Sequence, residues 1–196
     1  MPDLVFDPSD EAFNMKVHSF EIEYEDVFSL QNLYDQIYLW VVENGFTSVE
    51  SDDDQFETLY QHSISNDGSV EHRIWWRVDM ESARADYFKY FLKIDFRTIN
   101  MSKVKVDHKG KQVSAHKGDV IIRAEAWLLL DANRTWRDSS WSYLHRFFRT
   151  RYQKQINEEE AMLYGLASDL QSNIKNFLDL KNPTPQKELF HPKHGL

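Results

Sequence analysis

The chain has 196 residues, of which 41% are hydrophobic and 14% aromatic, enough for one domain with a sizeable core. It has no cysteine, which excludes a disulfide framework, a thiolate zinc site and a cysteine nucleophile. The net charge of −9 is unevenly spread: residues 1–72 hold 17 acidic side chains and one lysine, whereas residues 101–155 hold 12 basic and five acidic ones. This split predicts either a partner for the basic part or acidic and basic elements that neutralise one another in the fold.

Three regions are expected along the chain. Residues 1–14 are rich in Asp, Pro and Ser and predict a flexible acidic arm, residues 15–180 a single α+β domain, and residues 181–196 a Pro-rich tail. The start of the chain lacks the apolar segment of a signal peptide, and no apolar run is long enough to span a membrane. We therefore expect a cytoplasmic protein without a transmembrane segment.

The domain is predicted to begin with a strand and a helix. Residues 17–24 alternate between two faces, which indicates a half-buried strand. Residues 30–43 place apolar side chains at helical spacing, and Asp26 or Ser29 can cap this helix at its start. Asn44-Gly45 is expected to end it, because glycine readily adopts the left-handed conformation of a helix stop.

The middle of the chain predicts antiparallel strands joined by hairpins. Two alternating runs, 56–64 and 70–80, flank Asn66-Asp67-Gly68-Ser69, in which Asp-Gly favours a turn that matches strand twist. Residues 87–99 and 119–131 alternate in the same way. Shorter segments, Val104–Asp107 and Gln112–Ala115, flank a second, basic hairpin at 108–111. One face of the later strands is expected to point inward: Phe88, Tyr90, Leu92, Ile94, Phe96, Val120, Ile122, Ala124, Ala126, Leu128 and Leu130.

A long C-terminal helix, either continuous and bent or in two pieces, is expected after Ser139 or Ser140. On a helical wheel its aromatic side chains, including Tyr152, face the sheet, and Arg146 and Arg149 face away. Arg151 falls nearer the apolar side and is predicted to be a partly buried charge that needs a carboxylate partner.

The order of strand, helix, about six to seven antiparallel strands and long C-terminal helix resembles the helix-grip superfamily of START-like and polyketide-cyclase-like proteins. The resemblance covers roughly residues 15–180 and rests on element order, without a motif. It implies a curved sheet around the C-terminal helix and a cavity that binds an apolar ligand. The superfamily has two short helices after the first strand, where this chain has one long one. The alternative architecture is an open antiparallel sheet with both helices packed on one face.

Few residues form a recognisable catalytic or metal-binding pattern. The six glycines form neither a P-loop nor a dinucleotide fingerprint, and the chain has no GxSxG or HExxH motif. Asp52-Asp53-Asp54 lacks the spacing of a calcium loop and predicts a solvated turn. His191 and His194 lie in the Pro-rich tail without a third ligand. We therefore predict no metal and no cofactor.

Two groups of residues are candidates for binding. The first is expected on inward strand faces, where aromatic and small side chains either pack as a plain core or line an apolar pocket with two histidines. Its members are His62, His72, Trp76, Tyr90, Ala124, Ala126 and Trp141. The second is basic and either protects a sheet edge or contacts anionic groups. Its members are Lys103, Lys105, Lys109, Lys111, Lys117, Arg134, Arg137, Arg146 and Arg149.

These patterns predict a non-enzymatic binding domain that encloses a small apolar ligand or presents its sheet and helix to a protein partner. The first alternative is a peripheral module that contacts nucleic acid or lipid headgroups through the basic hairpin and the Arg-rich helix. The second is a cyclase or lyase in the same cavity, with His62 or His72 as acid or base. The acidic N-terminal third argues against nucleic acid, because a global basic footprint is missing.

Overall fold

The computed structural model describes residues 12–49, 55–65, 68–108, 111–131 and 149–178, together with Phe6, Pro8 and Asp10. Within 106–108 and 111–114 only the strand backbone is described. The elements are β1 (Asn14–Phe28), α1 (Leu30–Glu43), β2 (Thr47–Ser48), β3 (Glu57–Ile64), β4 (Val70–Glu81), β5 (Phe88–His108), β6 (Lys111–Leu130) and α3 (Gln153–Phe177).

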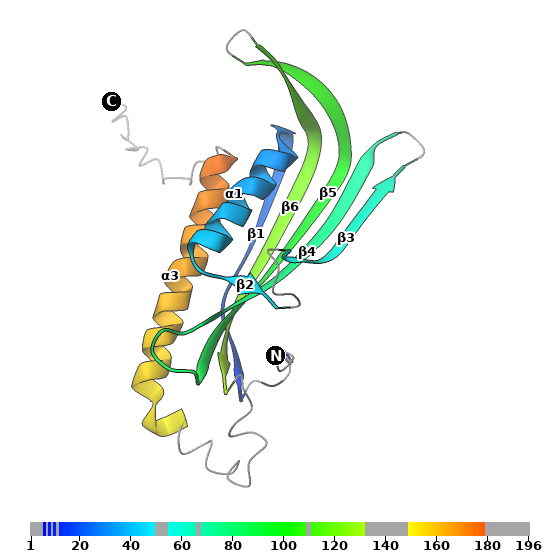
Figure 1. Ribbon diagram of the computed structural model, residues 1–196. Coiled ribbons are helices and arrows are strands. Elements are labelled where there is room, and N and C mark those ends of the chain that lie inside the picture. The colour runs from blue at the N-terminus through cyan, green and yellow to red at the C-terminus, as the bar shows by residue number, and fades with distance from the viewer. Residues whose placement is uncertain are drawn as a thin grey trace, which may run out of the picture.

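Six antiparallel strands form one open sheet, and both helices lie on the same face of it (Figure 1). The strand order is β1-β6-β5-β4-β2. Strands β2 and β3 both pair with β4: β2 pairs with Val78 and Asp79, and β3 pairs with residues 70–76. The sheet curves toward the helices, with α3 crossing β1 and β6 and α1 beside α3 (Figure 1). The predicted α+β class, with an N-terminal and a C-terminal helix on an antiparallel sheet, is confirmed.

The predicted inward face of the sheet is the main hydrophobic core. The alternating residues of β5 and β6 from Phe88 to Phe96 and from Val120 to Leu130 are buried, together with Trp76 and Val78 of β4. Alternation places these side chains on one face because the side-chain period of a strand is two residues. From the helices, Leu33, Ile37 and Val41 of α1 and Leu163 of α3 complete the core.

The two helices are fastened to each other by polar contacts as well as by apolar packing. Ser29 caps α1 by accepting a hydrogen bond from the backbone N–H of Asn32, so the second of the two predicted caps is used. The indole N–H of Trp40 in α1 donates to Asp169 of α3 over 2.7 Å. As predicted, α1 ends at Asn44-Gly45, with Gly45 at a φ of 81°.

The outer face of the sheet carries paired charges. Because β1 pairs with β6, Glu21 meets Arg123, and Lys16 lies 2.8 Å from Glu125. Arg77 and Asp95 form a similar pair between β4 and β5 over 2.7 Å. The acidic first strand and the basic central segment are therefore adjacent, and part of the charge asymmetry of the sequence is neutralised within the fold.

The longest strands, β5 and β6, form a hairpin that continues beyond the rest of the sheet. The segments predicted as short flanking strands are continuous with their neighbours, and the register shifts between Ile99 and Ser102. There Asn100 has a φ of 54°, and the extra residue bends the strand. Gly118 faces the bulge, where a Cβ would lie 2.9 Å from the carbonyl oxygen of Ile99, so a glycine allows this close approach.

The predictions for the start of the C-terminal helix are partly wrong. A helical turn at 149–151 is interrupted at Tyr152, and α3 begins at Gln153. Tyr152 and Arg151 are exposed rather than packed on the sheet, and the first buried side chain of α3 is Ile156, one turn later. The prediction that Arg151 is a partly buried charge is wrong, and the buried ionisable side chain of this helix is Glu159, which is fully buried.

Candidate functional site

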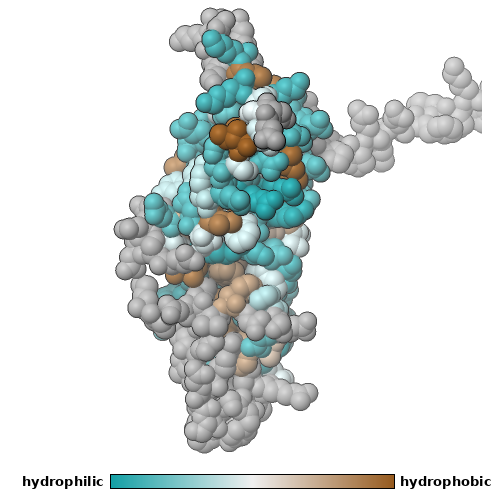
Figure 2. Space-filling view, turned by 90° about the vertical axis from the view of Figure 1, so that its right-hand side faces the viewer, coloured by the Kyte–Doolittle hydropathy of each residue, from teal (hydrophilic) through white to brown (hydrophobic). Residues whose placement is uncertain are grey.

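One end of the inner sheet face extends past the helices. At this end β3 places Tyr60, His62 and Ile64 on the helix-facing side, opposite Ile74, His72 and Val70 of β4. Tyr60 is 60% exposed and Ile64 is 67% exposed, although residues of the same face under the helices are buried. Figure 2 views the molecule from the opposite side, away from the helices, where the described surface is largely hydrophilic and the hydrophobic residues form separate small patches.

The β5–β6 hairpin adds lysines to the same end. Val70 pairs with Met101, and Lys103 follows two residues later on the extended part of β5, opposite His116 of β6. Lys103 and Lys105 are both exposed. Neighbouring strands are about 4.8 Å apart, so Ile64 and Met101 are separated by roughly 10 Å across the sheet. Apolar and basic side chains therefore share one surface, which we call the open end and define as Tyr60, His62, Ile64, Lys103 and Lys105.

Two of the predicted site residues, His62 and His72, are a directly paired cross-strand couple. Their ring centroids are 5.1 Å apart. His72 is half-buried, and its Nδ1 lies 3.0 Å from the hydroxyl oxygen of Thr98, which also accepts the backbone N–H of His72. Burial, followed by the charges of nearby His62 and His116, lowers the pKa of His72. His62 is exposed, so the pair faces solvent rather than an enclosed space, and its acid–base role stays a prediction.

His116 of β6 is a third imidazole near this couple. Burial lowers its pKa first, and the charge of Lys103 lowers it further. Its Nδ1 is buried without a hydrogen-bond partner. Among the described residues no group of three or more histidine or acidic side chains has the arrangement of a metal site. The three histidines are thus neighbours without forming a chelating set.

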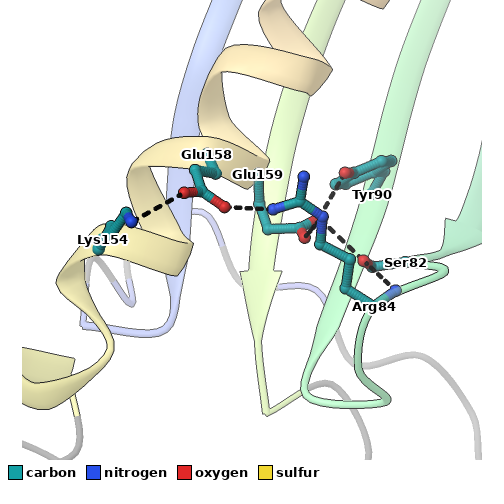
Figure 3. Close-up of polar contacts among 6 residues, drawn as sticks. All are labelled: Ser82, Arg84, Tyr90, Lys154, Glu158 and Glu159. Atoms are coloured by element: carbon teal, nitrogen blue, oxygen red, sulfur yellow. Dashed lines mark hydrogen bonds and ion pairs between the residues drawn. The ribbon is translucent and has the colours of Figure 1, made fainter.

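A buried polar cluster lies at the other end of the sheet, where α3 begins (Figure 3). Oε2 of Glu159 accepts hydrogen bonds from the Tyr90 hydroxyl over 2.5 Å and from the Ser82 hydroxyl over 2.8 Å. Its Oε1 lies 3.6 Å from Nε of Arg84 but receives no hydrogen bond. Arg84 also pairs with Glu158, whose carboxylate lies 3.9 Å from Lys154. The cluster joins α3 to β5 and to the β4–β5 connection.

Sequence reasoning missed the role of Glu159, although a signal was present. Glu159 lies three residues after Ile156 and four before Leu163, so helical spacing places it on the buried stripe of α3. The signal is masked in the sequence because Glu159 stands between Glu158 and Glu160, and a run of three glutamates is typical of a solvated face. Burial and the hydrogen bond to Glu159 raise the pKa of Tyr90 well above its usual range, so its phenol stays a donor.

The residues predicted to line an apolar pocket are brought together in the core. Trp76 is 0% exposed, so no space of water size borders its side chain, and Tyr90, Ala124 and Ala126 are also buried. The indole N–H of Trp76 has no hydrogen-bond partner, but Tyr34 of α1 lies edge-on at 4.8 Å between ring centroids. Trp141 lies outside the described residues. Ligand contact at these positions stays a prediction.

The predicted basic contact residues are only partly described. Lys103, Lys105 and Lys117 are exposed on the β5–β6 hairpin. Arg149 donates to the backbone carbonyl oxygen of Ala12 over 3.3 Å, so it contacts the N-terminal segment. Four members lie outside the described residues: Lys109, Arg134, Arg137 and Arg146. For Lys111 only the backbone is described.

The described part of the chain defines its class: an α+β fold with two helices on one face of an open six-stranded antiparallel sheet. No described helix is both long and apolar enough to cross a bilayer. No family model matches the sequence, and no curated protein matches it.

One similar solved structure is the di-domain aromatase/cyclase BexL from the BE-7585A biosynthetic pathway, aligned at 10% identity and a TM-score of 0.17. The alignment covers 82% of this chain and 51% of that protein, so the chain spans about half of its length. At this TM-score the likeness carries no argument about fold or activity.

Proposed function

We propose that the chain is a non-enzymatic binding domain that attaches peripherally to anionic lipid surfaces through the open end. The observation that carries this proposal is the exposure of Tyr60 and Ile64 beside Lys103 and Lys105 on one continuous sheet face. An aliphatic and an aromatic side chain next to lysines is the combination that interfacial binding uses. The apolar groups enter the headgroup boundary, and the lysines meet the negative surface.

An enclosed apolar ligand is less well supported by the packing. Four of the side chains expected to line its cavity are buried against protein, namely Trp76, Tyr90, Ala124 and Ala126, whereas the uncovered part of the same face lies beyond the helices. The acidic outer residues also fit an oriented attachment. Glu21 and Asp95 lie on the opposite face of the sheet and pair with Arg123 and Arg77, so they do not approach a surface bound at the open end.

Vesicle co-sedimentation tests the proposal. The wild-type chain should bind phosphatidylcholine vesicles that contain about a third phosphatidylserine, and added salt should weaken this binding. Lys103→Glu with Lys105→Glu should reduce the binding at least tenfold, because each basic residue near an anionic surface contributes about 1 kcal/mol. The matched control, Arg151→Glu with Lys154→Glu, makes the same charge change at exposed positions at the start of α3.

Three results would count against the proposal. The first is equal binding to neutral and anionic vesicles, and the second is an equal loss in both double variants. The third is binding to single-stranded RNA without binding to vesicles, which would assign the lysines to nucleic acid. Ile64→Ser should weaken vesicle binding even at high salt, because it removes the apolar contribution and leaves the charges unchanged.

A further inference from the structure

Three of the eight histidines lie together at the open end, one each on β3, β4 and β6. The ring centroids of His62 and His72 are 5.1 Å apart. His116 is near enough to interact electrostatically with His72, and its cross-strand partner on β5 is Lys103. One sheet face therefore places three imidazoles, which we call the histidine cluster, beside a lysine of the proposed lipid contact.

The surroundings of two of these rings favour the neutral form at neutral pH. Nδ1 of His116 is buried and has no hydrogen-bond partner in the described part of the chain. A proton there would leave a charged, buried donor without an acceptor, whereas the neutral ring can carry its proton on Nε2. Burial, and after it neighbouring positive charge, lowers the pKa of both His72 and His116, so these rings take up protons only at acidic pH.

The charged groups around the histidine cluster come from every element packed at this end. They are Glu57 of β3, Lys103 and Lys105 of β5, Asp26 of β1, Asp35 as the first charged residue of α1, and Lys175 in the last turn of α3. By strand alternation Glu71 and Arg73 of β4 and Lys117 of β6 lie on the opposite face. Among the described residues no carboxylate is in ion-pair contact with the cluster, and Glu57 accepts a hydrogen bond from the Tyr34 hydroxyl. Each proton that the cluster takes up therefore adds a positive charge to this end.

We propose that the histidine cluster makes the attachment of the open end to anionic lipid surfaces pH-dependent, so that the protein binds such surfaces more tightly at acidic than at neutral pH. This inference rests on the proposed lipid binding and names its regulation. Protonated imidazoles beside Lys103 and Lys105 strengthen the attraction to a negative surface. The Thr98 hydroxyl, 3.0 Å from Nδ1 of His72, serves either form of that ring, because a hydroxyl both donates and accepts. By reciprocity, the bound surface favours the protonated rings.

Vesicle co-sedimentation at pH 7.5 and pH 5.5 tests the inference. The vesicles are phosphatidylcholine with about a third phosphatidylglycerol, whose phosphodiester stays ionised over this range. The affinity of the wild-type chain should rise at least tenfold at pH 5.5, since each added charge near the surface contributes about fivefold. His72→Gln with His116→Gln should reduce this rise to less than threefold.

Two controls separate the cluster from the general loss of negative charge on acidification. His18→Gln removes a histidine of β1 that packs against Tyr164 of α3, and this variant should keep the tenfold rise. Vesicles of phosphatidylcholine alone should show no rise. A measurement on the wild-type chain needs no variant: the imidazole resonances of His72 and His116 should titrate at higher pH with anionic vesicles than in buffer.

The outcomes distinguish this inference from the proposed function. Wild-type binding that is equal at the two pH values would overturn the inference and leave lipid attachment standing, whereas no binding at either pH would overturn both. A rise of the same size in the double variant and in His18→Gln would assign the pH dependence to other groups. Resonances of His72 and His116 that titrate at the same pH with and without anionic vesicles would also contradict the inference.

Discussion

Replacement of Glu159 by alanine should destabilise the fold severely, because this carboxylate is the shared acceptor of a buried cluster. Two hydroxyl groups, from Tyr90 and Ser82, lose their acceptor when the side chain is truncated. A buried donor left without a partner costs about 1–3 kcal/mol, so the two hydroxyl groups together cost about 2–6 kcal/mol. The half-exposed Arg84 adds little, since solvent screens its attraction.

We therefore expect Glu159→Ala to lower the free energy of unfolding by about 2–6 kcal/mol, the cost of the two orphaned hydroxyl donors. Urea denaturation followed by circular dichroism measures this value from the midpoint and the slope. Glu160→Ala is the matched control, because it makes the same substitution in the next residue of α3, and it should change stability by less than about 0.5 kcal/mol. Tyr90→Phe should cost about 1.5–3 kcal/mol through the loss of one hydrogen bond to a charged group.

The double variant Glu159→Ala with Tyr90→Phe tests whether the two side chains act together. Removal of the phenol also removes one of the orphaned donors, so the double variant should be more stable than the sum of the single effects predicts by about 0.5–3 kcal/mol. Strictly additive effects, or a loss below about 1 kcal/mol for Glu159→Ala, would refute the argument that this cluster fastens α3 to the sheet.

Three further predictions concern other parts of the fold. Gly118→Ala should destabilise the chain by about 2 kcal/mol in thermal unfolding, because its Cβ would meet backbone atoms of β5 at 2.9 and 3.0 Å that cannot move independently; an unchanged melting temperature would refute this close approach. The free energy of unfolding should fall as the pH drops below 6.5, because His72 and His116 then become protonated in the unfolded chain while their lowered pKa values keep them neutral in the fold. His72→Gln should reduce the difference in the free energy of unfolding between pH 7.5 and pH 5.5, as measured by urea titration. Trp40→Phe should cost about 1.5–3 kcal/mol, since Asp169 loses an indole donor at 2.7 Å, and an effect below about 0.5 kcal/mol would show that this link between the helices is solvated.

Much of the candidate open end could be predicted from local patterns. The Asp-Gly turn and the alternation in 56–64 and 70–80 place His62 and His72 on the same face of one hairpin, and the structure pairs them directly. The exposure of Tyr60 and Ile64 on a helix-facing side could not be predicted, because it depends on where the helices stop covering the sheet. That boundary is set by the packing of α1 and α3 and has no local signature in β3.

The polar cluster around Glu159 and the apolar patch of Phe91, Trp127 and Leu129 on the outer face also combine a local pattern with contacts that only the tertiary structure makes. Helical spacing places Glu159 with Ile156 and Leu163, but its donors are 69 and 77 residues away in the sequence. Likewise, alternation places Trp127 opposite the core face of β6, and the register of β5 together with the packing of Phe6 and Val49 makes that position buried.

The sequence by itself determined the element order, the α+β class, the inward faces of 88–96 in β5 and 120–130 in β6, and the stop of α1 at Gly45. These features follow from side-chain periodicity and from local backbone preferences, which act over a few residues. Tertiary structure alone decided the pairing of acidic β1 with basic β6, the burial of Glu159 and the exposure of Arg151. These depend on contacts between distant segments and on where the sheet stops covering α3, and no short stretch of chain determines the free energy of such contacts.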